Sequence, residues 1–333
     1  MKSKNTMQTT PTTAPANTNT NTEAALAPRY LSVGIAQVGC NFDPDLEKRV
    51  RTNLDTLELH AGIISYFHHP DLIVFPEVFI EGPETVRAAE VAEPIPEGPI
   101  CQELMGVAKA LGVWLIPGSL FEAGEDGKVY NTAIVISPEG EFVTKHRKLY
   151  PARPIEATDP GDGYCVFDIP GKGKVGLMVC YDGVFPEVAR TLAWMGAEVI
   201  IKPALQTDAE GGLYASTAIW ITRAVENQCY FINVNVAAPM GNGQSCIIDP
   251  EGRMIEELGR VEANTCAVLN LAEVYRVRQY GNWGGGATIL KHWAYLGPKT
   301  FPCYEQGIEN GEVFKTLTPT YAENPMEVQS YPK

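Results

Sequence analysis

The chain has 333 residues, 45% of them hydrophobic, which is enough for one large α/β domain or two smaller ones with a substantial core. Its formal net charge of −14 at pH 7 argues against a surface that binds nucleic acid or an anionic membrane. The global charge does not fix the charge of a substrate, because a local site can oppose the global field.

The first 29 residues differ in composition from the rest of the chain. They are rich in Thr, Asn, Ala and Pro and lack the apolar stretch of a secretory signal. We therefore expect residues 1–29 to form a disordered arm. No run of 18 apolar residues occurs later in the sequence, so we expect no membrane span and a cytoplasmic protein.

The 8 cysteines are sparse for a chain of this length, and several lie in apolar, strand-like runs. This favours buried free thiols in a reducing compartment over a disulfide framework. The cysteines show no C-x-x-C spacing and the 5 histidines are scattered. We therefore expect no metal and no other cofactor.

From residue 30 the sequence alternates between strand-like and helix-like segments. Apolar residues at helical spacing from Leu46 to Ile64 predict a helix, with Asp43 as its N-cap and Pro44 in its first turn. Pro138-Glu139-Gly140 predicts a hairpin turn. The other elements expected in this half are strands at 30–38, 71–77, 113–120, 129–137 and 141–148 and a helix at 99–112.

The second half repeats this order and has its own hairpin turn at Pro250-Glu251-Gly252. Two helix-flanked sheets, each with such a hairpin, suggest two sheets packed face to face with helices outside. The alternative is one doubly wound sheet of Rossmann type, but no G-x-G-x-x-G motif follows a strand. The elements expected here are strands at 164–169, 174–180, 197–203, 229–237 and 244–250 and helices at 185–196 and 213–228.

Three polar residues, Glu77, Lys148 and Cys180, stand at or just past the ends of predicted strands. Each alone has a simpler explanation: a solvated loop carboxylate, a charged edge strand or a buried thiol. Together they supply a base, a fixed positive charge and a nucleophile. The turn after Cys180 is expected to point backbone N–H groups at the sulfur, which favours a thiolate and can receive charge developing on a carbonyl oxygen. A Cys-His pair would need His146, the only histidine near a motif, and no G-x-S-x-G elbow competes.

Three segments, LIVFPEVFIEG (72–82), KHRKLYPARPIE (145–156) and VCYDGVFPE (179–187), resemble the Glu–Lys–Cys signature of the nitrilase superfamily in order and spacing. The resemblance covers roughly residues 30–280 and implies a carbon-nitrogen hydrolase domain there. That family has an αββα four-layer sandwich and hydrolyses non-peptide C–N bonds through a cysteine thioester. By this resemblance Glu77 is the general base, Lys148 stabilises the oxyanion and Cys180 is the nucleophile.

The residues around the signature resemble the aliphatic amidase and formamidase branch. Glu156 lies eight residues after Lys148, where those enzymes carry a fourth catalytic residue, and would help Glu77 to position water. The N–H group of Tyr181 would help to hold the oxyanion. Ala152 and Thr158 stand where those enzymes carry tryptophans, which implies a wider acyl pocket and a preferred substrate other than formamide.

The resemblance implies hydrolysis of a small amide to a carboxylic acid and ammonia. A nitrilase is disfavoured by Glu156 and by the Cys-Tyr-Asp context of residues 180–182. An N-carbamoyl amidohydrolase stays open, because Arg223-Ala-Val-Glu-Asn227 is similar to the carbamoylase and ω-amidase branches. A non-catalytic, oligomeric binding module is the remaining alternative, and it would have no need to keep all three signature residues.

Residues 281–333 are rich in aromatic residues but weakly periodic. Aromatic side chains in a segment without a core of its own suggest contact with a neighbouring subunit. The predicted helices at 185–196 and 213–228, where family members commonly pair, are further candidates for an interface. We expect a homodimer or a larger even-numbered homo-oligomer, with a small-molecule amide as substrate.

Overall fold

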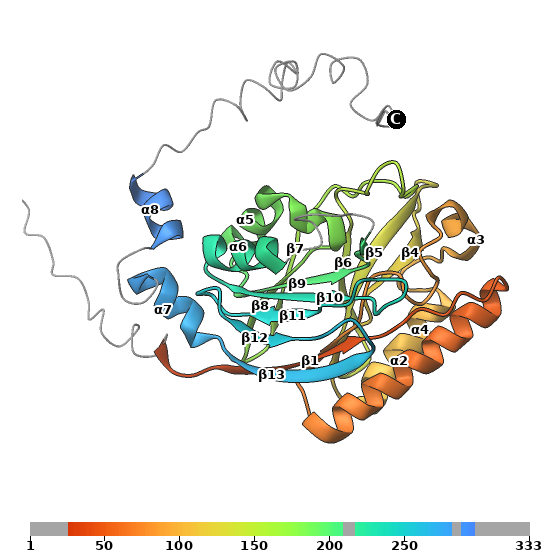
Figure 1. Ribbon diagram of the computed structural model, residues 1–333, viewed down its shortest axis with the longest axis horizontal. Coiled ribbons are helices and arrows are strands. Elements are labelled where there is room, and N and C mark those ends of the chain that lie inside the picture. Colours follow the sequence, from red (N-terminus) through yellow and green to blue (C-terminus); the bar gives the residue numbers. More distant parts are fainter. Residues whose placement is uncertain (1–25, 209–216, 282–287, 297–333) are drawn as a thin grey trace, which may run out of the picture.

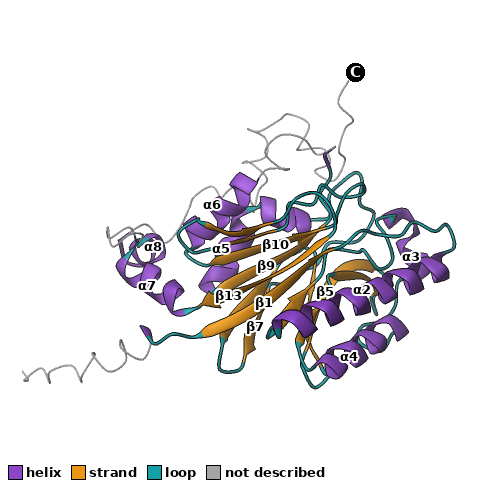
Figure 2. Cartoon of the chain, turned by 60° about the horizontal axis from the view of Figure 1, so that its bottom comes forward, coloured by secondary structure: helices purple, strands orange, loops and turns teal. Residues whose placement is uncertain are grey.

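The computed structural model describes residues 26–208, 217–281 and 288–296. Two mixed β-sheets pack face to face, and helices cover the outer face of each sheet (Figures 1 and 2). The predicted αββα sandwich is therefore confirmed. The predicted arm at 1–29 and the extension at 281–333 lie mostly outside the described residues, as does the first part of the predicted helix at 213–228.

The first sheet contains most strands of the first half of the chain. Its strands are β1 (Tyr30–Gln37), β2 (Leu72–Val74), β3 (Trp114–Ile116), β4 (Ser119–Ala123), β5 (Val129–Ile136), β6 (Phe142–Arg147) and β13 (Ala263–Asn270). Within the described ranges it has seven strands, in the order β13-β1-β2-β3-β5-β4, and β6 pairs with β5. The β1, β2 and β3 strands are parallel, so the segments that follow them leave the sheet at the same edge.

The second sheet is built from the second half of the chain. Its strands are β7 (Cys165–Ile169), β8 (Gly173–Leu177), β9 (Val199–Ala204), β10 (Tyr230–Asn235), β11 (Cys246–Ile248) and β12 (Met254–Glu257). They lie in the order β12-β11-β10-β9-β8-β7, and β8, β9 and β10 run parallel to one another.

Helices close both sides of the sandwich. They are α2 (Leu46–His68), α3 (Ala88–Val91), α4 (Pro99–Leu111), α5 (Pro186–Trp194), α6 (Thr217–Asn227), α7 (Ala272–Tyr280) and α8 (Ile289–Leu296), with 3-10 turns η1 (Thr85–Arg87) and η2 (Cys180–Val184). The α2 and α4 helices cover the first sheet, and α5 and α6 cover the second (Figure 1). None of these helices is long and apolar enough to cross a membrane.

The hydrophobic core has three layers that follow the alternation of side chains along the strands. Leu31, Val33 and Ile35 of β1 face the other sheet and join the central core. On its opposite face β1 meets α2, and Gly34 allows this close approach, because an added Cβ would lie 2.5 Å from Cγ2 of Ile64. Burial of apolar area of this kind is the main favourable term in folding.

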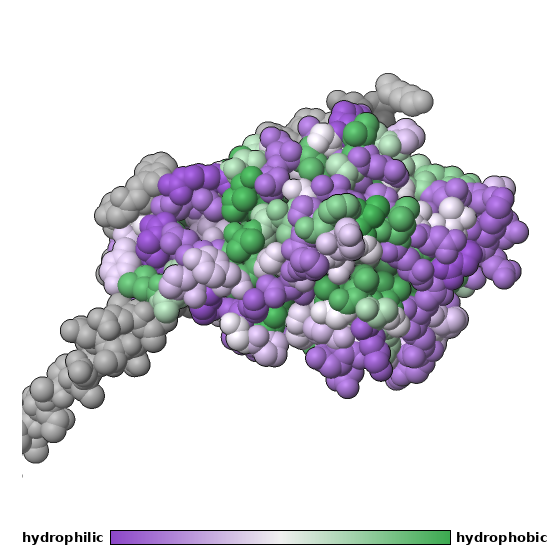
Figure 3. All heavy atoms as spheres, turned by 90° about the horizontal axis from the view of Figure 1, so that it is seen from below, coloured by the Kyte–Doolittle hydropathy of each residue, from purple (hydrophilic) through white to green (hydrophobic). Residues whose placement is uncertain are grey.

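The α2 helix is amphipathic, as its periodicity predicted. Its buried apolar residues, Leu54, Leu57, Ala61 and Ile64, recur at helical spacing and face the first sheet. From below, the surface mixes hydrophobic patches with larger hydrophilic areas (Figure 3). The exposed apolar residues that α2 and β13 contribute are Leu59, Ile63, Tyr66, Phe67 and Val268.

Two predicted boundaries are wrong. The α2 helix begins at Leu46 with Asp45 as its N-cap, and the Asp45 carboxylate accepts a hydrogen bond of 3.2 Å from Lys48 N. Asp43 instead accepts from the N–H group of Asp45 and forms a turn before the helix. The strand predicted at 113–120 is two strands, β3 and β4, because Pro117 has no N–H group and Gly118 has a φ of 93°.

Five of the helices and strands in the described ranges were not predicted: β12, β13, α3, α7 and α8. β13 pairs antiparallel with the whole of β1, from Tyr30 opposite Asn270 to Gln37 opposite Ala263. Only Ala267 and Leu269 of β13 are buried, so the strand lacks a strong alternating pattern.

Candidate active site

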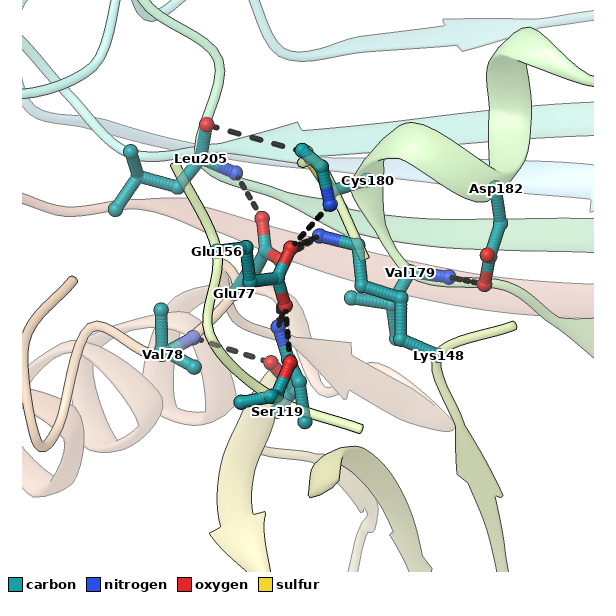
Figure 4. A network of polar contacts seen from close by, with 12 residues as sticks. Glu77, Val78, Ser119, Lys148, Glu156, Val179, Cys180, Asp182 and Leu205 are labelled. Atoms are coloured by element: carbon teal, nitrogen blue, oxygen red, sulfur yellow. Dashed lines mark hydrogen bonds and ion pairs between the residues drawn. The ribbon is translucent and has the colours of Figure 1, made fainter. Parts of the chain in front are cut away.

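The signature residues meet at one edge of the sandwich, between the two sheets (Figure 4). Glu77 follows β2 and Lys148 follows β6 in the first sheet, while Cys180 follows β8 and Leu205 follows β9 in the second. A cavity of about 370 Å³ opens at this edge. It is lined by Glu77, Val78, Pro83, Thr85, Asn131, Lys148, Ala152, Arg153, Ile155, Glu156, Cys180, Tyr181 and Leu205.

Lys148 lies between two carboxylates. Its Nζ is 2.8 Å from Oε1 of Glu77 and 2.6 Å from Oε2 of Glu156, and all three side chains are buried. Burial alone would lower the pKa of Lys148, but the charges of Glu77, Cys180 and Glu156 outweigh it and raise that pKa well above its usual 10.5. Lys148 is therefore a permanent positive charge inside the cavity.

Glu156 is held as a carboxylate by four donors. Its Oε2 accepts from Lys148 and from Ala152 N (2.9 Å), and its Oε1 accepts from Asn131 Nδ2 (3.0 Å) and Thr158 Oγ1 (2.9 Å). Burial would raise the pKa of Glu156, but the Lys148 charge and these hydrogen bonds lower it below 4.5. Glu156 therefore stays charged at neutral pH.

Asn131 links the two carboxylates. Its Nδ2 donates to Oε1 of Glu77 at 2.8 Å and to Oε1 of Glu156 at 3.0 Å. An amide nitrogen facing two acceptors fixes the orientation of the side chain. Asn131 lies in the buried part of β5, so it orients both acidic groups from a rigid strand.

The Glu77 carboxylate and the Cys180 thiol contact the same peptide segment. Oε2 of Glu77 accepts a hydrogen bond of 2.7 Å from Leu205 N, and Sγ of Cys180 lies 3.9 Å from Leu205 O (Figure 4). Leu205 directly follows β9, a central strand of the second sheet. One residue thus places the carboxylate and the thiol near each other.

The position of the segment that carries Glu77 requires a glycine at residue 118. A Cβ added to Gly118 would lie 1.7 Å from the backbone oxygen of Pro76, so only glycine allows the two segments to approach this closely. Next to Glu77, Val78 has a φ of 37°, and its N–H donates to the backbone oxygen (3.1 Å) and Oγ (3.2 Å) of Ser119. These contacts hold Glu77 against the first sheet.

Cys180 opens the η2 turn in a strained conformation, with a φ of 46°. The predicted helix follows this turn as α5, which begins at Pro186. Asp182 holds the turn: its carboxylate accepts from Val179 N (3.0 Å) and Tyr150 N (2.9 Å), and it lies 3.0 Å from Nε2 of His146. The buried Asp182 thus ties the Cys180 turn to the segment around Lys148.

The α6 helix contacts the η2 turn through Arg223. Nε of Arg223 donates to the backbone oxygen of Gly183 at 3.0 Å, and its Nη2 donates to that of Val184 at 2.7 Å. Arg223 therefore contacts the backbone of the turn, and it is not among the residues that line the cavity.

The structure places the predicted site residues as follows. Glu77, Lys148, Glu156 and Cys180 come together, and Ala152 and Tyr181 line the cavity. Thr158, expected in the acyl pocket, is not part of the lining, because it is buried behind Glu156 and donates to that carboxylate. In the described parts of the chain, no three His, Cys, Asp or Glu side chains are grouped as metal ligands, and no cysteine forms a disulfide bond.

Sequence reasoning missed Asn131, Leu205, Asp182 and Arg153. The one signal for Asn131 is a polar residue inside the apolar run VYNTAIVI (129–136), which indicates a buried polar group with partners. Leu205 contacts the site through its backbone, so the identity of its side chain could not predict its role.

The chain is similar to known proteins in sequence and in fold. The sequence model of the carbon-nitrogen hydrolase family matches residues 33–279. A formamidase of Bacillus cereus (strain B4264) is 32% identical over 232 residues, 65% of each chain, and a nitrilase of Pyrococcus abyssi is 38% identical over 216 residues, 60% of this chain and 79% of the other. The chain thus matches only about two thirds of the formamidase's length.

Solved structures show the same fold. Nit3 of Saccharomyces cerevisiae, a nitrilase-superfamily member, has a TM-score of 0.68 at 26% identity over 75% of this chain and 94% of its own. A variant of the amidase from Nesterenkonia sp. AN1 has a TM-score of 0.66 at 24% identity with the same coverage. The chain belongs to the carbon-nitrogen hydrolase family of the nitrilase superfamily.

Proposed function

We propose that this protein hydrolyses a small linear amide to a carboxylic acid and ammonia through a thioester on Cys180. The proposal rests chiefly on one observation: a thiol, two carboxylates and an ammonium group surround a single cavity at the edge between the sheets. The matches to formamidases support an amide as the substrate.

Covalent catalysis suits an amide, which is a poor electrophile with a poor leaving group, because it divides the reaction into two easier steps. Glu77 accepts the thiol proton as the sulfur attacks the amide carbon. It returns that proton to the nitrogen, so ammonia leaves and a thioester remains. Water then attacks the thioester carbon and gives a proton to Glu77, which passes it back to the departing sulfur.

The contacts of the two carboxylates favour Glu77 over Glu156 as the base. Glu77 contacts the same residue, Leu205, as the Cys180 thiol does. Glu156 accepts four hydrogen bonds, and its lowered pKa makes it a weak base. We therefore assign proton transfer to Glu77, and to Glu156 the roles of holding Lys148 and positioning water.

Lys148 supplies the positive charge for the tetrahedral oxyanion, together with the N–H group of Tyr181. Because both neighbouring carboxylates fix its ammonium group before the reaction, little reorganisation is needed when negative charge develops. One preorganised oxyanion donor is typically worth about 100-fold to 1,000-fold in rate.

The test is the release of ammonia from a panel of amides, nitriles and ureido compounds, with Cys180→Ala as the blank. We expect ammonia from amides and none from the blank. Release of carbon dioxide together with ammonia from ureido compounds would instead identify an N-carbamoyl amidohydrolase. Turnover of nitriles alone would identify a nitrilase, and an inert protein would support the binding module. The expected cytoplasmic location and homo-oligomer stay predictions.

A further inference from the structure

Thr85 joins two segments of the cavity wall that lie far apart in sequence. It begins the η1 turn, and its Oγ1 donates a hydrogen bond of 3.1 Å to the backbone oxygen of Ile155 and accepts one of 3.0 Å from Ala157 N. Both partners belong to the β6–β7 loop (residues 148–164). Within the described ranges, no other hydrogen bond links η1 to this loop. The hydroxyl therefore contacts the peptide bonds on both sides of Glu156.

The backbone of Glu156 has no strand beside it. Glu77 forms a β-bridge to β4, and Lys148 N donates to a backbone oxygen of β5 at 2.8 Å, so the sheet fixes both. Glu156 N instead donates to Ala152 O of its own loop at 3.0 Å. Loop backbone of this kind is among the least stable parts of a fold, so contacts from other segments matter more for Glu156 than for the other two residues.

Burial along the β6–β7 loop alternates around Glu156. Ile155 and Ala157 are exposed, whereas Glu156 is buried and its Oε2 lies 2.6 Å from Nζ of Lys148. A shift of the loop backbone would move the carboxylate away from the ammonium group. Thr85 thus restrains the backbone of the residue whose side chain helps to fix Lys148.

The segment that carries Thr85 is attached to the α2 helix. Oε2 of Glu84 lies 3.0 Å from Nη1 of Arg49, and the Arg49 side chain is buried. Nη1 of Arg49 also donates to the backbone oxygen of Glu81 at 3.3 Å. Because α2 packs on the first sheet, Thr85 contacts the loop from a well-packed part of the fold.

We propose that Thr85 is a positioning residue for amide hydrolysis: its hydroxyl holds the β6–β7 loop so that the Glu156 carboxylate stays on Lys148. The proposal rests on the function proposed above and adds a residue outside the Glu–Lys–Cys signature. Without the hydroxyl, Glu156 and Lys148 occupy their reactive arrangement for a smaller fraction of the time, and the oxyanion is less well stabilised. The loss therefore falls on kcat, because this arrangement acts on the transition state.

The test compares Thr85→Val, which keeps the shape and loses both hydrogen bonds, with Thr85→Ser, which keeps the hydroxyl. Ile155 and Ala157 are exposed, so water can replace the hydroxyl and both variants should fold. Thr85→Val should lower the kcat of ammonia release at least about fivefold, the worth of one net hydrogen bond, and change KM by less than about twofold. The kcat of Thr85→Ser should stay within about twofold of the wild type.

Hydrogen exchange measures the restraint on the loop directly. Ala157 N donates to the Thr85 hydroxyl, so Thr85→Val should speed exchange in peptides that contain residue 157, and Thr85→Ser should not. Thr52→Val is the matched control. Its hydroxyl also donates to a backbone oxygen, that of Lys48 at 2.9 Å, but Thr52 lies on α2 and is not part of the cavity lining. The control should change neither kcat nor exchange in the loop.

Three outcomes would overturn the inference. An unchanged kcat in Thr85→Val, or equal losses in Thr85→Val and Thr85→Ser, would show that the hydroxyl does not position Glu156. A loss confined to KM would show that Thr85 only shapes the pocket. A wild type that hydrolyses no amide would refute the proposed function and with it the positioning role, whatever the exchange of the loop.

Discussion

Glu81 provides a quantitative test of the electrostatics around the segment that carries Glu77. Its carboxyl group is buried, Oε1 accepts a hydrogen bond of 2.9 Å from Phe121 N, and Oε2 has no hydrogen-bond partner in the described structure. Burial raises the pKa of Glu81 to about 8, and the nearby charge of Glu93 adds to this effect. Glu81 is therefore mostly protonated at neutral pH.

The raised pKa of Glu81 lowers the stability of the fold, and this loss grows as the pH rises. The folded pKa of Glu81, about 8, lies above its unfolded value of 4.5. The protonated group therefore makes its full contribution to the stability of the fold below pH 4.5, and this contribution is lost as the pH rises toward about 8. At about 1.36 kcal/mol for each pH unit, holding the proton at pH 7 costs about 3 kcal/mol. Glutamine has the same shape as a protonated glutamate side chain, and it does not titrate. Glu81→Gln should therefore raise the free energy of unfolding by about 3 kcal/mol at pH 7 and by little at pH 4.5.

Denaturant unfolding at pH 4.5 and pH 7, followed by circular dichroism, measures this difference. Glu90→Gln is the matched control, because Glu90 is exposed and pairs with Arg87, so the substitution should give no stabilisation that grows with pH. An equal gain from Glu81→Gln at both pH values, or a loss at pH 7, would refute the reasoning.

Three substitutions probe the site itself. Asp182→Asn replaces one carboxylate oxygen with a donor at a place where backbone N–H groups need acceptors. The variant should lose about 1–3 kcal/mol of stability, and its kcat should fall more than its KM rises. An unchanged kcat would show that the Cys180 turn does not depend on Asp182. Glu156→Gln should fold, lose most of its ammonia release and leave Cys180 open to alkylation by iodoacetamide, whereas nearly wild-type kinetics would remove Glu156 from the mechanism. Ala152→Trp adds bulk to the cavity wall and should depress activity on larger amides more than on acetamide or formamide; equal effects across a size series would show that Ala152 does not face the substrate.

Much of the fold could be predicted because local patterns report burial. Short apolar runs such as 72–76 and 174–179 mark central strands, and the polar residues that end them, Glu77 and Cys180, lie at one edge of the sandwich. The periodicity of α2 likewise predicted the face that packs on the first sheet. In each case the sequence of a single segment is enough to predict its structure.

Features that depend on contacts between distant segments could not be predicted. Asn131 lies 54 residues from Glu77 and 25 from Glu156 in sequence, and only the pairing of strands brings them together. Leu205 contributes backbone groups, which no side-chain pattern reveals. β13 was missed because its mostly half-buried, mixed sequence becomes a strand only through pairing with β1.

The central claim is that the Cys180 sulfur forms a covalent intermediate with the substrate. Mass spectrometry of the protein quenched in acid during turnover of an amide tests it most directly. We predict a mass gain equal to the acyl group on the peptide that contains Cys180, removable by hydroxylamine and absent from Cys180→Ala. Turnover without an adduct on Cys180, together with a Cys180→Ala variant that still releases ammonia, would contradict the account.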